Sequence, residues 1–203
     1  MTALPRRAFM AGLVATLPGC ATLGALDAAS RPRPTFELTP VPGRSGARRA
    51  LTLAVVLPDA PAAIDTDRIL VKPDPLSVAY LPDAHWTEPV PALVQSLVIR
   101  SVAATGRVGH IGAAEGGPVP DVALILRIDA FQAEPTDGIA EIAVRIALSA
   151  TLIRDRDQRL IASREFSGTA VAPSEAPVDL IPAFQRAIDG ILPALADWTV
   201  AAI

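Results

Sequence analysis

The chain has 203 residues, a formal net charge of −3 at neutral pH and a single cysteine. This length suits one domain with a sizeable core. The mildly acidic balance provides no broad basic field, so we expect no nucleic-acid partner.

The N-terminus has the pattern of a bacterial export signal. Arg6 and Arg7 precede an apolar run over residues 8–17, which is followed by small residues. The run is roughly half the length that spans a bilayer, so it predicts the core of a signal peptide and not a permanent anchor. The letters RRAFM, which begin at Arg6, resemble a twin-arginine export motif. An ordinary Sec signal with two arginines is an equal alternative.

Cys20, the only cysteine, is predicted to carry lipid. The letters LPGC, which end at Cys20, resemble the lipobox of bacterial lipoproteins, where the signal peptidase cleaves before a cysteine bearing a diacylglyceryl group. A buried small hydrophobe or a reactive thiol would leave the preceding signal-like sequence unexplained. We therefore predict a signal peptide over residues 1–19, diacylglyceryl and N-acyl lipid on Cys20, and no other cofactor. Cleavage removes two arginines and no acid, so the formal net charge falls from −3 to −5.

The lipidated segment leads into one domain. Residues 20–34 are small, polar and proline-bearing, as is typical of a tether, and the domain is expected over 35–203. It opens with a strand over 35–40, followed by a loop rich in glycine and arginine and a strand over 51–57. Two further strands, 68–71 and 76–80, are predicted to form a hairpin.

A helical period follows this hairpin. Apolar residues recur at i, i+3 and i+4 spacing and predict a helix over 88–104. Thr87 is expected to cap the helix, Pro89 suits its first turn, and Gly106 is the expected stop.

The C-terminal half is predicted to form more strands and a second helix. The expected strands are 108–111, 121–131, 139–153 and 160–169. Over 142–152 every second residue is apolar, which predicts a strand with one buried face and one wetter face. A helix over 180–198 has Pro182 in its first turn, and Gly190 and Pro193 should kink or fray its second half. The fold class is therefore α/β in the α+β sense, a single domain with a largely antiparallel or mixed sheet packed by two main helices.

The sequence contains no recognisable motif for catalysis or metal binding. His85 and His110 stand far apart without a zinc-type motif, and no nucleophile elbow, P-loop or dinucleotide motif is present. The glycine-rich residues 112–120 fit a loop better than a phosphate cradle. We predict no catalytic residue, no metal site and no enzyme activity.

Four features, taken in order, carry a resemblance. The lipobox cysteine precedes a short tether, and FELTP over 36–40 resembles a Tyr-x-Leu-x-Pro opening strand. The letters DRI from Asp67 and VAY ending at Tyr80 resemble paired central strands. DAHWTEPVP over 83–91 resembles a signature before the first helix, in which an arginine commonly occupies the place of His85. Together they resemble the ABC-type transport auxiliary lipoprotein family, specifically its PqiC-like group.

The resemblance implies a non-enzymatic, periplasm-facing lipoprotein component of an ABC/MCE-type lipid transport system that docks the machinery to the outer membrane. Its implied partners are an MCE-type substrate-binding protein and ABC transporter subunits, and a homo-oligomer would suit the role. The implied location is the cell envelope, lipid-anchored, and Ala21 after the cysteine resembles an outer-membrane address.

Aromatic residues are the candidates for partner contact. Tyr80 and Trp86 are the best of them and Trp198 is a third, with buried packing as the alternative for each.

Two other functions remain open. One is a monomeric lipid- or glycolipid-binding carrier with an apolar cavity, and the other is an envelope hydrolase with a polar cleft.

Overall fold

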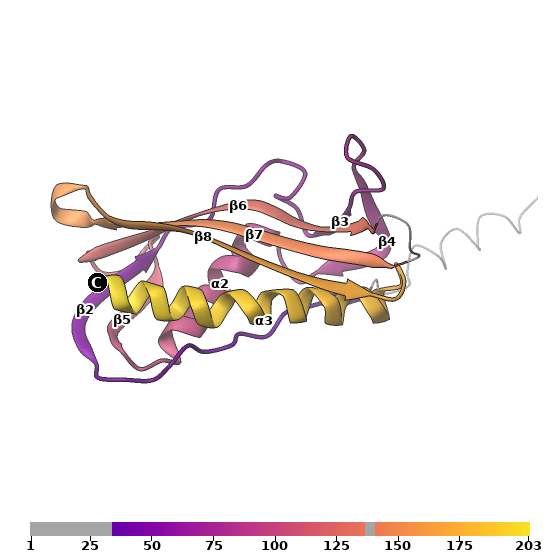
Figure 1. Cartoon of the computed structure of the whole chain (residues 1–203). Coiled ribbons are helices and arrows are strands. Elements are labelled where there is room, and N and C mark those ends of the chain that lie inside the picture. Colours follow the sequence, from indigo (N-terminus) through magenta and orange to yellow (C-terminus); the bar gives the residue numbers. More distant parts are fainter. Residues whose placement is uncertain (1–33, 137–140) are drawn as a thin grey trace, which may run out of the picture. The chain divides into compact units, whose positions relative to one another are not determined.

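The computed structural model describes residues 34–136 and 141–203 (Figure 1). Predicted features at Arg6, Arg7 and Cys20 lie outside these residues. The elements are β1 (Thr35–Phe36), β2 (Arg49–Val55), β3 (Arg68–Val71), β4 (Ala79–Trp86), α2 (Val90–Ala103), β5 (Val108–Ala113), β6 (Val122–Pro135), β7 (Ile142–Arg154), the 3-10 turn η1 (Asp155–Asp157), β8 (Arg159–Ala172) and α3 (Pro177–Ala202).

A mixed eight-stranded sheet organises the domain, with β6 at its centre. One edge of β6 pairs with β7 in antiparallel register. The other edge is shared by two parallel strands, because β2 lies beside the start of β6 and β3 beside its end. Outside these, β5 pairs with β2, β4 with β3, β1 with β4 and β8 with β7. The predicted fold class, a mixed sheet with two helices in one α+β domain, is confirmed.

The long strand β7 follows from alternation in the sequence. Every second residue of β7, from Ile142 to Leu152, is buried, as predicted for a strand with one covered face. The tight connection to β8 is closed by Gln158, which has a left-handed backbone with φ of 54°.

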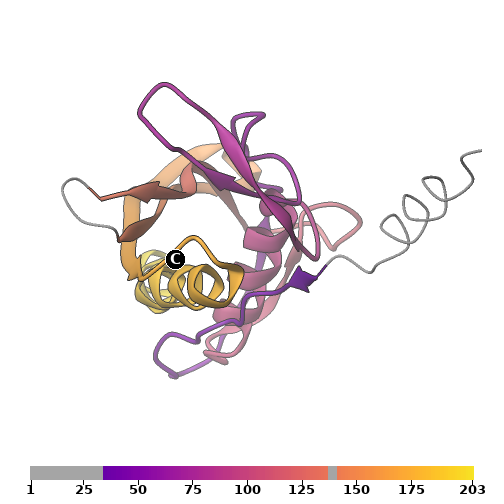
Figure 2. The ribbon, with the colours of Figure 1, turned by 90° about the vertical axis from the view of Figure 1, so that its right-hand side faces the viewer.

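The two helices lie on the concave side of the curled sheet (Figure 2). α3 contacts β7, β8 and α2, whereas α2 also contacts β5 and β2. α3 approaches β8 closely at Gly168, where a Cβ would overlap the carbonyl oxygen of Ala187. Arg186 of α3 also donates to the carbonyl oxygen of Val171 at 2.7 Å. The absence of a side chain at Gly168 thus sets how tightly the helix and strand pack.

The helix starts differ from the prediction. α2 begins at Val90 after an extended Pro89, and no side chain caps it. The backbone N–H of Thr87 instead donates to the carbonyl oxygen of Phe36 at 3.0 Å, which makes Thr87 a continuation of the sheet. The predicted Thr87 cap was therefore wrong.

The second helix is longer than predicted. α3 starts at Pro177, so Pro182 lies beyond the first turn, and the helix continues through Gly190 and Pro193 to Ala202. The predicted fraying does not occur, because buried residues on both sides of Pro193 pack against the rest of the core and outweigh one lost backbone hydrogen bond. In the described part of the chain no helix is both long and apolar enough to cross a membrane.

Candidate functional site

The most exposed large apolar residue in the described part of the chain lies in the connection between β3 and β4. This segment, residues 72–78, is called the Leu76 loop. The side chain of Leu76 is 96% exposed and that of Val78 is 52% exposed. The loop stands out from the body of the domain (Figures 1 and 2). Exposed apolar side chains grouped on a projecting segment are typical of a contact site.

Hydrogen bonds to Asp74 define the shape of the Leu76 loop. The Oδ1 atom of Asp74 accepts from the backbone N–H of Leu76 at 2.9 Å and of Ser77 at 3.0 Å. Hydrogen bonds from Ser77, which have the larger effect, and from the backbone of Leu76 hold the pKa of Asp74 below its ordinary value. Prolines on either side of Asp74 further restrict the backbone. Leu76 is therefore presented by a constrained turn.

Tyr80 lies at the base of the Leu76 loop. Its hydroxyl donates to the carbonyl oxygen of Ala63 at 3.2 Å, and the guanidinium carbon of Arg68 lies 4.0 Å from its ring centroid. The side chain is half-buried. Tyr80 therefore supports the hairpin and remains a candidate for partner contact. The predicted pairing of the two strands is confirmed by the register of Leu70 with Tyr80.

Trp86 does not belong to the surface. It is 1% exposed and makes edge-to-face contacts with Phe131 and Phe184, with ring centroids 5.7 and 5.2 Å apart. Its interpretation as a partner contact was wrong, because burial in this aromatic cluster leaves nothing for a partner to touch. Trp198 is half-buried and packs on Phe166 with 5.6 Å between ring centroids.

The interior gives no support to the carrier alternative. The concave side of the sheet is filled by one continuous apolar cluster, to which both helices and the aromatic cluster contribute. Larger hollows on the described surface, such as the one beside the Leu76 loop, open to solvent. An acyl chain would have to displace packed side chains to enter.

Among the described residues, neither histidine contacts the hydrogen-bonded pair of Ser149 and Asp129. Nδ1 of His85 lies 3.3 Å from Oδ2 of Asp67, while His110 is exposed on β5. Ser149 donates to Asp129 at 2.6 Å on the exposed sheet face without a histidine between them. Over residues 34–136 and 141–203, no group of three metal-ligating side chains converges.

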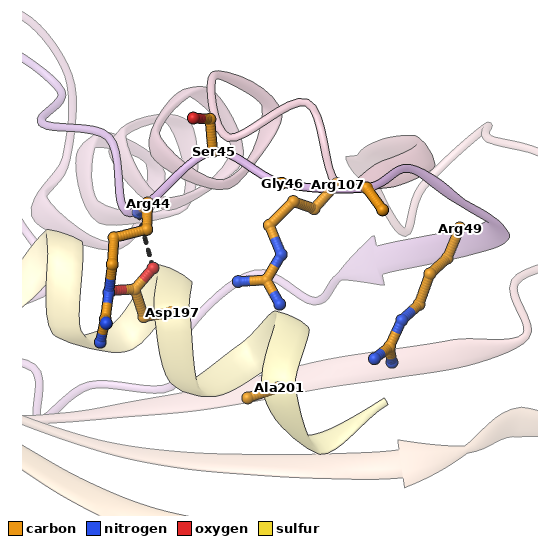
Figure 3. A pocket seen from close by; sticks show the side chains of 8 residues that line it. Arg44, Ser45, Gly46, Arg49, Arg107, Asp197 and Ala201 are labelled. Carbon is orange, nitrogen blue, oxygen red and sulfur yellow. Dashed lines mark hydrogen bonds and ion pairs between the residues drawn. The ribbon is translucent and has the colours of Figure 1, made fainter.

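A second feature is a basic pocket near the C-terminal end of α3, called the arginine pocket. The hollow has a volume of about 510 Å³. It is lined by Arg44, Ser45, Gly46, Ala47, Arg49, Arg107, Asp197 and Ala201, which are drawn in Figure 3. The sequence did not predict this site, because its arginines come from segments about sixty residues apart. The only early signal was the arginine-rich loop before β2.

The segment after β1 reaches the arginine pocket by running along α3. Gln185 exchanges two hydrogen bonds with the backbone of Thr39, at 2.8 and 3.1 Å. Farther along α3, Asp197 accepts from the backbone N–H of Arg44 at 2.7 Å and from its Nε at 2.9 Å. Hydrogen bonds from Arg44, with the nearby charges of Arg44 and Arg107, hold the pKa of Asp197 below its ordinary value. Asp197 therefore stays ionised and fixes one wall of the pocket.

Comparison with known proteins identifies the family. A family model described as the ABC-type transport auxiliary lipoprotein component matches residues 36–196, so the chain belongs to this family. The model describes this family as a lipoprotein component that assists ABC-type transport.

Individual relatives resemble the chain over most of its length. A Bradyrhizobium diazoefficiens protein, bll6063, is 28% identical over 177 residues, which cover 83% of this chain but only 45% of that relative. The chain thus spans less than half the length of the curated relative it matches. The crystal structure of protein XCC0632 from Xanthomonas campestris has 27% identity and a TM-score of 0.72, and the match covers 83% of this chain and 93% of that one. Another crystal structure, with 12% identity and a TM-score of 0.57, covers 80% and 97% of the two chains and shares the fold alone.

Proposed function

We propose that this lipoprotein is a non-enzymatic adaptor of an MCE-type lipid transport system, which docks the transport machinery to the outer membrane from the periplasmic side. Membership of the auxiliary lipoprotein family supports the transport role. The observation that carries the docking role is the Leu76 loop, a constrained turn with an aliphatic tip that is 96% exposed.

The energetics of the Leu76 loop suit binding. Full burial of a leucine side chain in a partner's pocket is worth about 1.5–3 kcal/mol. The two hydrogen bonds to Asp74 order the turn before binding, so less conformational entropy is lost on association. Tyr80, at the base, adds an aromatic surface beside the same contact.

Membrane attachment in this proposal depends on the N-terminal segment. Export through the signal containing Arg6 and Arg7 and cleavage before Cys20 would leave acyl chains on that cysteine, and several chains together hold a protein firmly at a membrane. Residues 20–34 would act as the tether. Ala21 after the cysteine supports the outer membrane as the destination.

The proposed partners are an MCE-type substrate-binding protein, ABC transporter subunits and further copies of this chain. The end strands of the sheet support self-association, since among the described strands β5 pairs only with β2, β8 only with β7 and β1 only with β4. Such edges offer unpaired backbone groups to another strand.

Site-specific photocrosslinking in living cells tests the docking role. A benzoylphenylalanine at position 76 should crosslink to an MCE-type protein or an ABC transporter subunit. The matched control is position 119, where Val119 is 86% exposed at the opposite end of β6. In parallel, Cys20→Ala should release the protein from the membrane.

Two results would contradict the proposal. One is equal crosslinking of transporter subunits from positions 76 and 119, which would separate docking from the Leu76 loop. The other is the absence of any transporter subunit at both positions, which would remove the adaptor role itself.

A further inference from the structure

We infer that the arginine pocket, formed where the start of β2, the connection from α2 to β5 and the last turns of α3 meet, binds a phosphate-bearing anion. This inference goes beyond the adaptor function and does not depend on it.

The arginines are brought together by backbone pairing. β2 and β5 run parallel from this end, with Arg49 in register with Val108. The backbone N–H of Arg49 donates to the carbonyl oxygen of Arg107 at 2.9 Å, so Arg49 lies beside Arg107, the residue that directly precedes β5. In Figure 3 their guanidinium groups both extend toward the last turns of α3.

A glycine helps to position Arg107. A Cβ on Gly46 would come within 3.2 Å of Cδ and Nε of Arg107. Because Gly46 has no side chain, the stem of Arg107 can lie across this loop. The side chain of Arg107 is thereby directed into the hollow, not away from it.

The charges in the arginine pocket are not balanced by the protein. Asp197 is engaged by Arg44, with 2.9 Å between Nε and Oδ2. Within residues 34–136 and 141–203, no carboxylate lies within ion-pair distance of Arg49 or Arg107. The lining therefore has three arginines against one aspartate, in a chain whose formal net charge is −3. Guanidinium groups held close together repel one another, and an anion between them would remove that repulsion.

The geometry favours phosphate among anions. A guanidinium presents a planar set of donors that matches two phosphate oxygens at once, and two or three such groups can surround a tetrahedral oxyanion. The hollow, at about 510 Å³, has room for a phosphate with an ester substituent. Neither Arg49 nor Arg107 uses its side-chain donors in a hydrogen bond with another described residue.

The C-terminus of α3 provides a competing explanation for the arginines. Its last turn contains no basic residue, and cations stabilise the partial negative charge at a helix C-terminus. If that were their only role, replacing Arg49 or Arg107 would lower the melting temperature and no anion would bind to the wild-type protein.

Isothermal titration calorimetry on the full lipoprotein in phosphatidylcholine nanodiscs tests the inference. The probes are inorganic phosphate and glycerophosphoglycerol, with zwitterionic glycerophosphocholine as the reference. We expect at least one of the two anions to bind, and Arg49→Gln and Arg107→Gln each to weaken binding about tenfold or more. Arg100→Gln is the matched control, because Arg100 pairs with Glu37 at 3.1 Å and does not line the pocket.

The probes also distinguish the sources of the anion. Tighter binding of inorganic phosphate supports a free phosphate or a monoester, whereas tighter binding of glycerophosphoglycerol supports a lipid headgroup. No binding of either anion, or equal binding by the wild type and both glutamine variants, overturns the inference. If the glutamine variants do not fold, Arg107→Lys should still bind several-fold more weakly, and wild-type affinity should fall as NaCl is raised. Unchanged affinity in both of those measurements also overturns it.

Discussion

The apolar residues of α3 that face the core and those of the Leu76 loop have the same chemistry but opposite surroundings. Phe184 and Ala187 on α3 are at most 1% exposed, whereas Leu76 is 96% exposed. A change in the first region should alter the free energy of unfolding, and a change in the second should alter binding alone. This difference separates the framework of the domain from the surface that we propose for docking.

The largest effect is expected from the aromatic cluster. Phe184→Ala removes a fully buried ring that contacts both Trp86 and Phe131, and should lower the free energy of unfolding by about 4 kcal/mol. Urea unfolding monitored by circular dichroism measures this loss. A loss below about 1 kcal/mol would mean that the cluster is not the centre of the core.

The helix–strand approach should be the next most sensitive point. Gly168→Ala places a Cβ against the carbonyl oxygen of Ala187, so α3 must shift and the free energy of unfolding should fall by about 3 kcal/mol. The matched control is Gly190→Ala, where a Cβ meets nothing within 4 Å. This control should stabilise α3 by about 0.5–1 kcal/mol. Equal effects of the two variants on urea unfolding would show that α3 and β8 do not approach closely.

Substitutions in the Leu76 loop should reverse this pattern. Leu76→Ser should change the free energy of unfolding by no more than about 0.5 kcal/mol, because the side chain is exposed in the folded protein. It should nevertheless weaken association with the purified MCE-type partner about tenfold, measured by biolayer interferometry. Val119→Ser, at the other end of β6, should change neither quantity. A large loss of stability in Leu76→Ser would mean that the loop stabilises the domain and is not only a binding surface.

The smallest expected effect is the pH dependence of the Arg44–Asp197 pair. Arg44 depresses the pKa of Asp197 in the folded protein, so the pair stabilises the fold above the ordinary aspartate pKa of about 4 and loses this contribution as pH falls through the lower, folded value. Because the pair is near the surface, its contribution should be under about 1 kcal/mol. The stability advantage of wild type over Asp197→Asn should therefore be present at pH 6 and shrink below pH 4.

Carboxyl NMR of Asp197 in Arg44→Gln should show a higher pKa than in wild type. An advantage that stays constant with pH would exclude this linkage.

Local patterns in the sequence determined much of the architecture. Alternation over 142–152 and the helical period after residue 88 each depend on neighbours along the chain, and both were predicted correctly. The pairing of the strands on either side of residues 72–75 was also predicted, but β4 begins at Ala79 and not at residue 76. The family resemblance also rests on short stretches in a fixed order, and residues 36–196 match that family.

The tertiary structure alone decided which side chains became accessible. Trp86, Phe131 and Phe184 meet from three elements, so burial of Trp86 could not be inferred from its own surroundings in the sequence. Leu76 belongs to a short apolar stretch that was predicted to be a strand, yet the bonds to Asp74 hold it in an exposed turn. The arginine pocket likewise requires the parallel pairing of β2 and β5, which brings Arg49 beside Arg107. Periodicity depends on residues that are close in the sequence, whereas contacts between distant strands and helices form only when the chain has packed.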